Sequence, residues 1–383
     1  MGIVFASNYF NHHQSSLSYY LHELTGQNYW FIATEAMEEE RKTMGWSNID
    51  IPPYVLDYHA DPARCAEIID SADAVIWGSA PSAVVQSRLT QGKLTLLYSE
   101  RIHTAGYNRL KLIKHGPQMY MKYGRYKNLY LLCASAFAAF DYAQSGTFVN
   151  KAYKWGYFPP FEKRDDIMEL IDKKPADEVE ILYVSRLIPL KHPELPLLVA
   201  ARLMKDGIPF HLTMIGHGEL RQKVDEMIHE HGLGKAVTLI DSLSPDEVRK
   251  HMDKANIFLF TSDSHEGWGA VMNESMSSAC AVVASSEIGS VPFLMEDNKN
   301  GCIYRDGDLD DLYRKVKALC LNQVLREKLG TEAYHTIENT WNAETAAKRL
   351  LELITDLKDD GKSNRFLTGP CSKAEILKDG WYE

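Results

Sequence analysis

The chain has 383 residues, of which 45% are hydrophobic and 25% charged, and this length favours two globular domains. Its net charge of −10 makes the molecule as a whole a poor electrostatic match for nucleic acid. The six cysteines lie far apart without a Cys-x-x-Cys pair, which argues against a zinc site and is typical of a reducing compartment.

The N-terminus opens directly into an apolar run at 3–6, without the basic segment of a secretory leader. No window of the sequence contains the roughly 18–20 consecutive apolar residues that a membrane-spanning helix needs. These observations predict a cytoplasmic protein.

Short apolar runs alternate with amphipathic stretches in the first half of the chain. The predicted strands are 3–6, 29–33, 74–78, 94–98 and 129–133, and helical patterns lie between several of them, at 62–69 and 82–89. The loop after the first run contains His12 and His13, and it either caps the following helix or contacts a ligand.

The segment 101–127 is basic throughout. It has seven lysines and arginines, no acidic residue, and tyrosines interleaved with the cations. Such a stretch fits an anionic membrane surface, and a solvated helix face is the alternative. No nucleic-acid-binding motif accompanies it, so we expect no nucleic-acid partner.

A proline- and charge-rich stretch separates the two halves. It runs from Pro159-Pro160 to Pro175 and predicts an interdomain linker. The aromatic segment 154–159 before it is interpreted as a hydrophobic clasp between domains. We predict a first domain at 1–170, a second at 176–345, and a helix and tail at 346–383 that crosses back to the first domain.

The second half repeats the strand–helix alternation. Strands are predicted at 180–184, 211–215, 237–240, 257–260 and 281–284, and helices at 195–204, 220–231, 245–252 and 270–279. Ser244-Pro245-Asp246-Glu247 is a capping box with proline at the first helical position. Continuous Val/Ile/Leu runs are typical of parallel strands buried on both faces, so we predict an α/β protein of two doubly wound, Rossmann-like domains.

Two cations follow the strand at 180–184. Arg186 and Lys191 lie on the loop at the carboxyl end of this strand, where open α/β sheets bind ligands. Arginine offers a planar fork to phosphate oxygens and lysine a point charge, so the pair indicates an anion site. Two solvated surface cations are the alternative.

A glycine pair follows the next strand. Gly216 and Gly218 precede a predicted helix, where glycines let a ligand approach the backbone and the helix N-terminus favours anions. A plain tight turn is the alternative.

The third motif lies after the strand at 257–260. Glu266 is followed by Gly267, Trp268 and Gly269, and Glu274 comes eight residues after Glu266 on a predicted helix. Carboxylates and backbone amides are groups that hydrogen-bond sugar hydroxyls. An acidic loop that complements the helix dipole is the alternative.

In this order the motifs resemble those of glycosyltransferase family 4, a retaining family with the GT-B fold. The family carries Gly-Arg-Leu…Lys, Gly-x-Gly and Glu-Gly-Phe-Gly…Glu, and this chain has Ser-Arg-Leu…Lys at 185–191, Gly-His-Gly at 216–218 and Glu-Gly-Trp-Gly…Glu at 266–274. The resemblance covers roughly 181–304. The departures at 185, 268 and 280–281 bear on the identity of the donor sugar more than on activity.

The resemblance implies that Arg186 and Lys191 clamp the diphosphate of a nucleotide-sugar donor. It implies that Glu266 contacts the donor sugar and Glu274 the ribose hydroxyls. The implied donor-binding set is Arg186, Lys191, Gly216, Gly218, Gly267, Trp268, Gly269 and Glu274. A UDP-sugar is favoured over a GDP-sugar, and no metal is required because the two cations neutralise the diphosphate.

For the acceptor side, the resemblance points to the loop after the strand at 94–98. Family members often place a histidine or an acidic residue there, so His103 and Glu100 join Glu266 as candidate catalytic residues. The implied acceptor is a glycan or a lipid-linked molecule in the synthesis of surface polysaccharide or glycolipid, reached at the inner face of the membrane. A nucleotide-sugar epimerase of the same fold and a non-catalytic partner subunit are the alternatives.

Overall fold

The computed structural model describes residues 1–37, 50–102 and 115–382. These form two compact units, and each is described by itself. The N-terminal unit comprises Met1–Pro160 and Thr340–Lys378, and the C-terminal unit comprises Phe161–Asn339 and Asp379–Glu383. The first boundary therefore falls at Pro160, before the predicted linker ends, and the last residues of the tail group with the C-terminal unit.

The N-terminal unit contains a seven-stranded sheet in which every neighbouring pair of strands is parallel. In sheet order the strands are β3 (Val55–Asp57), β2 (Tyr29–Ala33), β1 (Ile3–Ser7), β4 (Ala74–Trp77), β5 (Thr95–Ser99), β6 (Leu129–Cys133) and β7 (Ala152–Lys154). The strand order reverses between β1 and β4, as in a doubly wound sheet.

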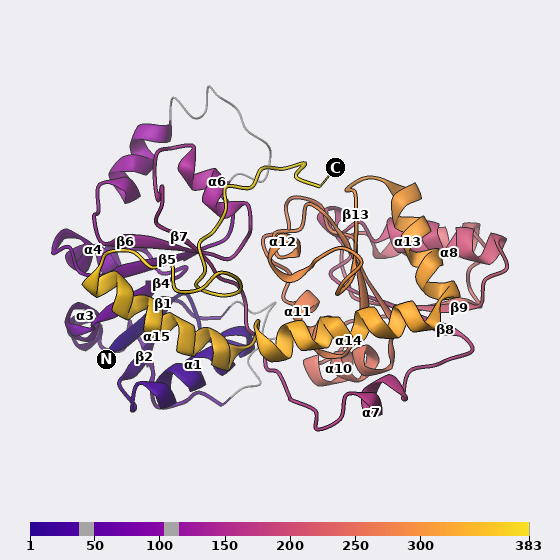
Figure 1. The fold of residues 1–383 in the computed structure, drawn as a ribbon, viewed down its shortest axis with the longest axis horizontal. Coiled ribbons are helices and arrows are strands. Elements are labelled where there is room, and N and C mark those ends of the chain that lie inside the picture. Colours follow the sequence, from indigo (N-terminus) through magenta and orange to yellow (C-terminus); the bar gives the residue numbers. More distant parts are fainter. Residues whose placement is uncertain (38–49, 103–114, 383) are drawn as a thin grey trace. The chain divides into compact units, whose positions relative to one another are not determined.

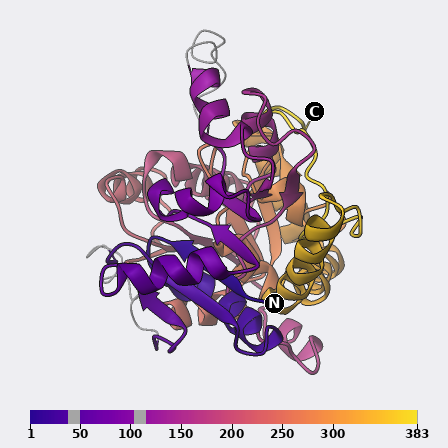
Figure 2. The same cartoon turned by 90° about the vertical axis from the view of Figure 1, so that its left-hand side faces the viewer.

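Helices connect these parallel strands, because each return to the same end of the sheet needs a crossover. They are α1 (His12–Leu24), α3 (Pro62–Ser71), α4 (Ser82–Thr90) and α6 (Ala138–Ala143), with a π-helical turn at Tyr120–Gly124. Asn11 caps α1 in a capping box with Gln14, so the loop before α1 has the predicted capping role. The late helix α15 (Ala343–Asp359) lies beside α1 and the N-terminus in both views (Figures 1 and 2).

The chain after α15 covers an edge of the same sheet. Lys373 forms an antiparallel bridge with Tyr153 of β7, and the Lys154 amide donates to the Ser372 carbonyl at 2.7 Å. The segment therefore satisfies edge groups that would otherwise be open to pairing with another chain.

The C-terminal unit contains a six-stranded parallel sheet. In sheet order the strands are β10 (Val237–Ile240), β9 (Phe210–Ile215), β8 (Val179–Val184), β11 (Ile257–Phe260), β12 (Ala281–Ser285) and β13 (Cys302–Tyr304). The helices are α7 (Met168–Ile171), α8 (Glu194–Lys205), α9 (Arg221–Glu230), α10 (Pro245–Lys254), α11 (Val271–Ser277), α12 (Val291–Leu294), α13 (Leu309–Leu321) and α14 (Gln323–Asn339), with a 3₁₀ turn at Pro189–Lys191. Ser244 caps α10 in the predicted box with Glu247.

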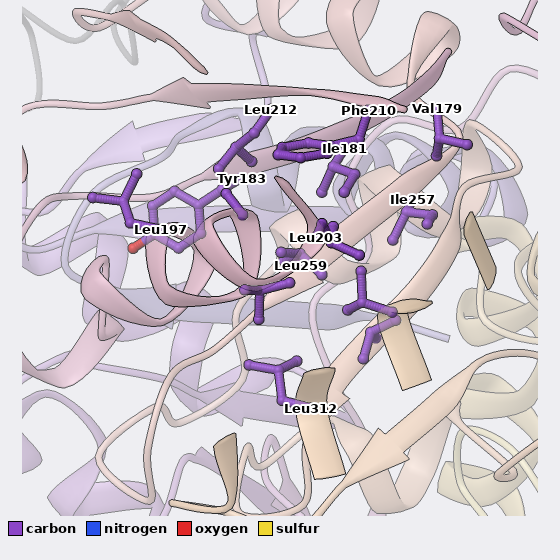
Figure 3. Close-up of a cluster of buried hydrophobic side chains, with 14 of the residues drawn as sticks. Val179, Ile181, Tyr183, Leu197, Leu203, Phe210, Leu212, Ile257, Leu259 and Leu312 are labelled. Carbon is purple, nitrogen blue, oxygen red and sulfur yellow. The ribbon is translucent and has the colours of Figure 1, made fainter. Parts of the chain in front are cut away.

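Alternate residues of the central strands point into one apolar layer of this unit (Figure 3). The layer brings together side chains from three strands and two helices: Val179, Ile181 and Tyr183 of β8, Phe210 and Leu212 of β9, Ile257 and Leu259 of β11, Leu197 and Leu203 of α8, and Leu312 of α13. Each such side chain contributes roughly 1.5–3 kcal/mol on full burial. This packing fixes the strands whose carboxyl ends carry the predicted motifs.

The prediction of an α/β protein with two doubly wound sheets is confirmed. Three strands were not predicted, β3, β7 and β13, and each forms an edge of its sheet and has three residues. Among the described residues, no helix is long and apolar enough to cross a bilayer. All six cysteines are free thiols.

Arg88 of α4 is a fully buried cation that ties three segments of the N-terminal unit together. Its guanidinium donates to the carbonyls of Ile69, Ala72, Asp73 and Leu94 at 2.7–3.1 Å. Burial lowers the pKa of Arg88 to about 10, so the group stays charged at pH 7. The carbonyl groups, rather than a directly bonded carboxylate, stabilise this buried charge.

We expect Arg88→Met to destabilise the N-terminal unit by about 3 kcal/mol, because the substitution leaves several buried carbonyls without a donor. Urea unfolding followed by circular dichroism measures the change. Arg64→Met, at an exposed arginine of the neighbouring helix α3, is the matched control and should change stability by under about 1 kcal/mol. Equal effects of the two substitutions would contradict the role assigned to Arg88.

Candidate active site

The strand order of the C-terminal sheet places two loops at its switch point. Strands β8 and β11 are neighbours, and the chain leaves them toward opposite sides of the sheet, to β9 and to β12. Open α/β sheets bind ligands outside the carboxyl ends of the strands at such a point. The loop after β8 carries Arg186 and Lys191, and the loop after β11 carries Glu266.

An ion pair joins these two loops. The Lys191 ammonium donates to the Glu266 carboxylate, and Ser262 Oγ donates to the same carboxylate oxygen at 3.0 Å. The side chains of Lys191 and Glu266 are only 13% and 12% exposed, so the pair is poorly screened by solvent. The structure thus brings together a cation and a carboxylate that lie 75 residues apart in the sequence.

The backbone around Lys191 is held as firmly as its side chain. The Lys191 carbonyl accepts from Thr261 Oγ1 at 2.9 Å and from the Tyr183 hydroxyl at 3.2 Å. The Asp263 amide donates to the Leu190 carbonyl at 3.0 Å. These bonds make the two loops one rigid platform.

Arg186 lies on the same loop, with an exposed side chain, and none of the described carboxylates forms an ion pair with it. Its guanidinium can therefore meet an incoming anion without first breaking a described salt bridge. The arrangement offers two cations of different kinds at one strand end, one exposed and one partly buried and paired.

Gly216 and Gly218 let two backbones meet. A Cβ at Gly216 would overlap the Ser185 carbonyl oxygen, and one at Gly218 would overlap the Leu187 carbonyl oxygen. The Leu187 amide donates to the His217 carbonyl at 2.9 Å across this contact. In this structure the glycine pair therefore packs the loop after β9 against the loop that carries Arg186.

Trp268 is buried in the interior of the C-terminal unit. Its indole N–H donates to Asn273 Oδ1 at 2.9 Å and its exposed fraction is 0%. Only the backbone of Trp268 can therefore line a ligand site. Gly269 has φ +76°, and a Cβ there would overlap the Phe260 ring. Gly267, just after Glu266, is likewise buried.

Glu274 lies on α11, close enough to Arg249 of α10 for the two charges to interact. Burial raises the pKa of Glu274, and the charge of Arg249 opposes this shift. Arg249 also donates to the Glu274 carbonyl at 2.9 Å and to Ser277 Oγ at 2.7 Å, which fixes the end of α11. A buried carboxyl so held can accept hydrogen bonds from ligand hydroxyls.

Glu100 follows β5 of the N-terminal unit directly. The Tyr157 hydroxyl donates to Glu100 Oε1 at 2.7 Å, and burial raises the pKa of Tyr157 well above its usual value, so the phenol remains a donor. The Arg101 guanidinium lies 3.5 Å from the Asp141 carboxylate, which also accepts from the Ile102 amide at 3.0 Å. This buried contact fixes the chain just after Glu100. His103, the other candidate, lies outside the described residues.

The aromatic segment before the first boundary packs inside the N-terminal unit. Trp155 is fully buried against Phe158, with ring centroids 4.9 Å apart, and Phe158 stacks on Trp341 at 6.4 Å. All three rings belong to the N-terminal unit, because the unit takes up the chain again at Thr340, and the interpretation of the segment as a clasp between domains stays a prediction.

Sequence reasoning missed two residues at these strand ends. Tyr157 lies 57 positions from Glu100, and no local pattern announces the contact. His192 follows Lys191 and contacts Asp263, on the loop that carries Glu266. The position of this histidine, directly after the candidate diphosphate-binding lysine, is a signal in the sequence that could have indicated its place at the site.

Three comparisons with known proteins agree with this geometry. Residues 166–336 match the family model described as glycosyl transferases group 1. Poly(ribitol-phosphate) alpha-N-acetylglucosaminyltransferase of Staphylococcus aureus is 29% identical over 175 residues, a match that covers 45% of this chain and 34% of that protein. A sulfoquinovosyl transferase of Arabidopsis thaliana is 24% identical over 368 residues, covering 90% of this chain and 70% of that protein. The chain thus spans about a third of the length of the first relative.

The fold of the whole chain also has solved counterparts. The structure of Anabaena HepE in complex with UDP and glucose has a TM-score of 0.66 and 12% identity, and the alignment covers 93% of this chain and 100% of that one. At this identity the likeness concerns the fold, which is GT-B. The part of the chain that matches the glycosyl transferases group 1 model, residues 166–336, lies within the C-terminal unit.

We expect Gly216→Ala to weaken nucleotide binding about tenfold or more, because the new methyl group displaces the Ser185 backbone beside Arg186. Calorimetric titration with UDP measures the affinity. Gly234→Ala, where a Cβ meets nothing within 4 Å, is the control and should leave affinity unchanged. Unchanged affinity in both variants would contradict the packing role of Gly216.

Proposed function

We propose that the protein is a retaining glycosyltransferase that moves a hexosyl or N-acetylhexosaminyl group from a nucleotide-diphosphate sugar to a glycan or lipid-linked acceptor. The carrying observation is the Lys191–Glu266 pair at the switch point of a glycosyl transferases group 1 domain. The transferase activities after which the relatives are named support sugar transfer, and the UDP in the HepE structure supports a UDP-sugar donor.

The donor diphosphate lies against Arg186 and Lys191. Lys191 then exchanges Glu266 for a phosphate oxygen, because the attraction between its ammonium and a doubly charged diphosphate is stronger than that between the ammonium and a singly charged carboxylate. The released Glu266 accepts hydrogen bonds from the donor sugar, and Glu274 accepts them from the ribose. These two cations supply the positive charge, so the proposal requires no metal.

Bond cleavage develops positive charge on the sugar and negative charge on the leaving phosphate. Fixed cations in a partly desolvated site stabilise that phosphate without reorganising. The acceptor hydroxyl attacks the anomeric carbon from the face that the phosphate leaves and gives its proton to an oxygen of that phosphate, so the sugar–phosphate bond is exchanged for the new glycosidic bond with retention of the anomeric configuration. Glu100, oriented by Tyr157, is the described candidate for contact with the acceptor, and His103 remains a candidate outside the described residues.

We expect Lys191→Met and Glu266→Gln each to lower kcat by about 10²–10³-fold, the range seen when one group that stabilises transition-state charge is removed. Transfer is followed as release of nucleotide diphosphate. The double variant removes both members of the partly buried pair together. Its melting temperature, compared with those of the two single variants, tests whether their loss of activity reflects unfolding. Lys205→Met, at an exposed lysine of α8, is the control. Full activity in either folded single variant would refute the assignment.

A thermal-shift panel of UDP, GDP, ADP and their common sugar conjugates, without added metal, tests the donor site directly. A ligand that binds only the folded state stabilises it by about 2.7 kcal/mol at one hundred times its Kd. We expect UDP and UDP-sugars to raise the melting temperature. If none of the nucleotides raises the melting temperature, the non-catalytic partner subunit is favoured instead. Conversion of the sugar without any acceptor would favour the epimerase.

We further propose that the basic stretch contacts an anionic membrane at the inner face, where a lipid-linked acceptor is located. In its described part, Tyr120 and Met121 are 50% and 55% exposed, and Lys122, Arg125 and Lys127 are also exposed. Tyr123 anchors this turn, because it is buried against Trp77 and Tyr142.

Charge reversal tests this surface. The triple variant K122E/R125E/K127E should lose binding to vesicles that contain anionic lipid, since each cation contributes about 1 kcal/mol near such a surface. The variant K235E/K250E/K328E makes the same charge change at exposed lysines of the C-terminal unit and should still bind. Sedimentation at low salt measures both. Failure of the wild-type protein to sediment would refute membrane contact.

A further inference from the structure

His192 has a backbone conformation that L-residues rarely adopt. Its φ and ψ are 47° and 56°, in the left-handed region, directly after Lys191. Thr261 Oγ1 donates to the carbonyls of both Lys191 and His192, at 2.9 and 3.3 Å. Such a conformation persists where surrounding contacts determine it, and it is found preferentially at ligand sites.

The imidazole of His192 lies between two carboxylates. Nδ1 is 2.8 Å from Glu194 Oε1, and Nε2 is 3.4 Å from Asp263 Oδ2. A neutral imidazole has one donor only, so the ring can donate to both carboxylates only as the imidazolium. The hydrogen bond with Glu194 raises the pKa of His192, burial opposes the shift, and the charges of Glu194 and Asp263 add to it.

The two carboxylates come from different segments of the site. Glu194 is the first residue of α8, after the loop that carries Lys191, and Asp263 lies three residues before Glu266. The imidazolium therefore joins the loop after β8 to the loop after β11. The Asp263 amide bond to the Leu190 carbonyl runs alongside this ionic contact.

Other charged and titratable groups share this environment. His265 Nδ1 lies 3.0 Å from Asp263 Oδ1. The charge of Lys223 of α9 interacts electrostatically with Glu194, and the charges of Glu194 and Glu266 interact in the same way with Tyr183. Lys191 and its partner Glu266 lie on the same two loops as His192 and Asp263.

We propose that His192 is a positioning residue whose imidazolium clamps the two donor-site loops together, so that affinity for a nucleotide sugar falls as the pH rises and the clamp is lost. This inference rests on the proposed donor site. His192 acts by holding the Glu266 loop in register with Lys191.

The sign of the pH dependence follows from the raised pKa. The clamp stabilises the fold fully below the ordinary histidine pKa of about 6.5, and this stability is lost as the pH rises through the higher pKa of the folded state. Above that pH the neutral ring donates to one carboxylate at most, and the contact with the other is lost.

Two substitutions at His192 separate the effect of the imidazolium charge from the effect of the left-handed backbone conformation. Asparagine tolerates the left-handed conformation and cannot ionise, and glycine adopts it without strain and has no side chain. His192→Asn and His192→Gly should therefore both keep the turn and remove the clamp. His211→Asn removes a partly exposed histidine of β9, and it serves as the control: the ring meets Thr238 Oγ1 and its charge acts on Glu180, but it does not bridge two carboxylates.

The first measurement is urea unfolding between pH 5.5 and 8.5, which needs no ligand. The stability of the wild type relative to His192→Asn should decrease across this range, whereas the difference between the wild type and His211→Asn should not follow the same course. A pH-independent difference between the wild type and both His192 variants would overturn the clamp.

The second measurement is calorimetric titration with UDP-glucose, whose diphosphate does not titrate in this range. Both His192 variants should bind about tenfold more weakly than the wild type at pH 6, and equally well at pH 8.5. Equal affinities at pH 6 would overturn the effect on the donor. If the wild type binds no nucleotide sugar, the proposed function fails, and the unfolding measurement still decides whether the clamp exists.

Discussion

Parallel strand pairing is the constraint on which the rest of this structure depends. Because all neighbouring strands of both sheets run in the same direction, the carboxyl ends of each sheet lie along one edge. Loops that are distant in the sequence must then meet at that edge. Because the strand order reverses between the neighbouring strands β8 and β11, the loops after these two strands lie side by side, and they carry Lys191 and Glu266.

The meeting loops are rich in charge, and most of these charges have a defined partner. Lys191 faces Glu266, and His192 faces Glu194 and Asp263, so alternating signs hold the loops together. In the proposed function, the donor diphosphate is one more anion in this pattern and competes with carboxylates already present. The buried Arg88 shows the other solution in this protein, a cation held by carbonyls for structure alone.

Much of this architecture could be predicted from the sequence, for physical reasons. Central strands such as Ile257–Phe260 are buried on both faces and read as apolar runs, whereas edge strands of three residues, such as Val55–Asp57, have too few side chains to show a pattern. Motif order identified the loops but not the directions of side chains. Trp268 turns into the core toward Asn273, and Tyr157 reaches Glu100, because tertiary packing decides both.

The N-terminal unit is discontinuous in the chain, since α15 belongs to it and follows the whole of Phe161–Asn339. During synthesis the whole of that inserted stretch emerges from the ribosome before α15 does. Until then, the face of α1 that α15 covers is exposed to solvent. The second sheet can thus finish its core first, and the first sheet must wait for the last helix. The order of completion is the reverse of the usual order for two-domain chains, in which the N-terminal domain folds first.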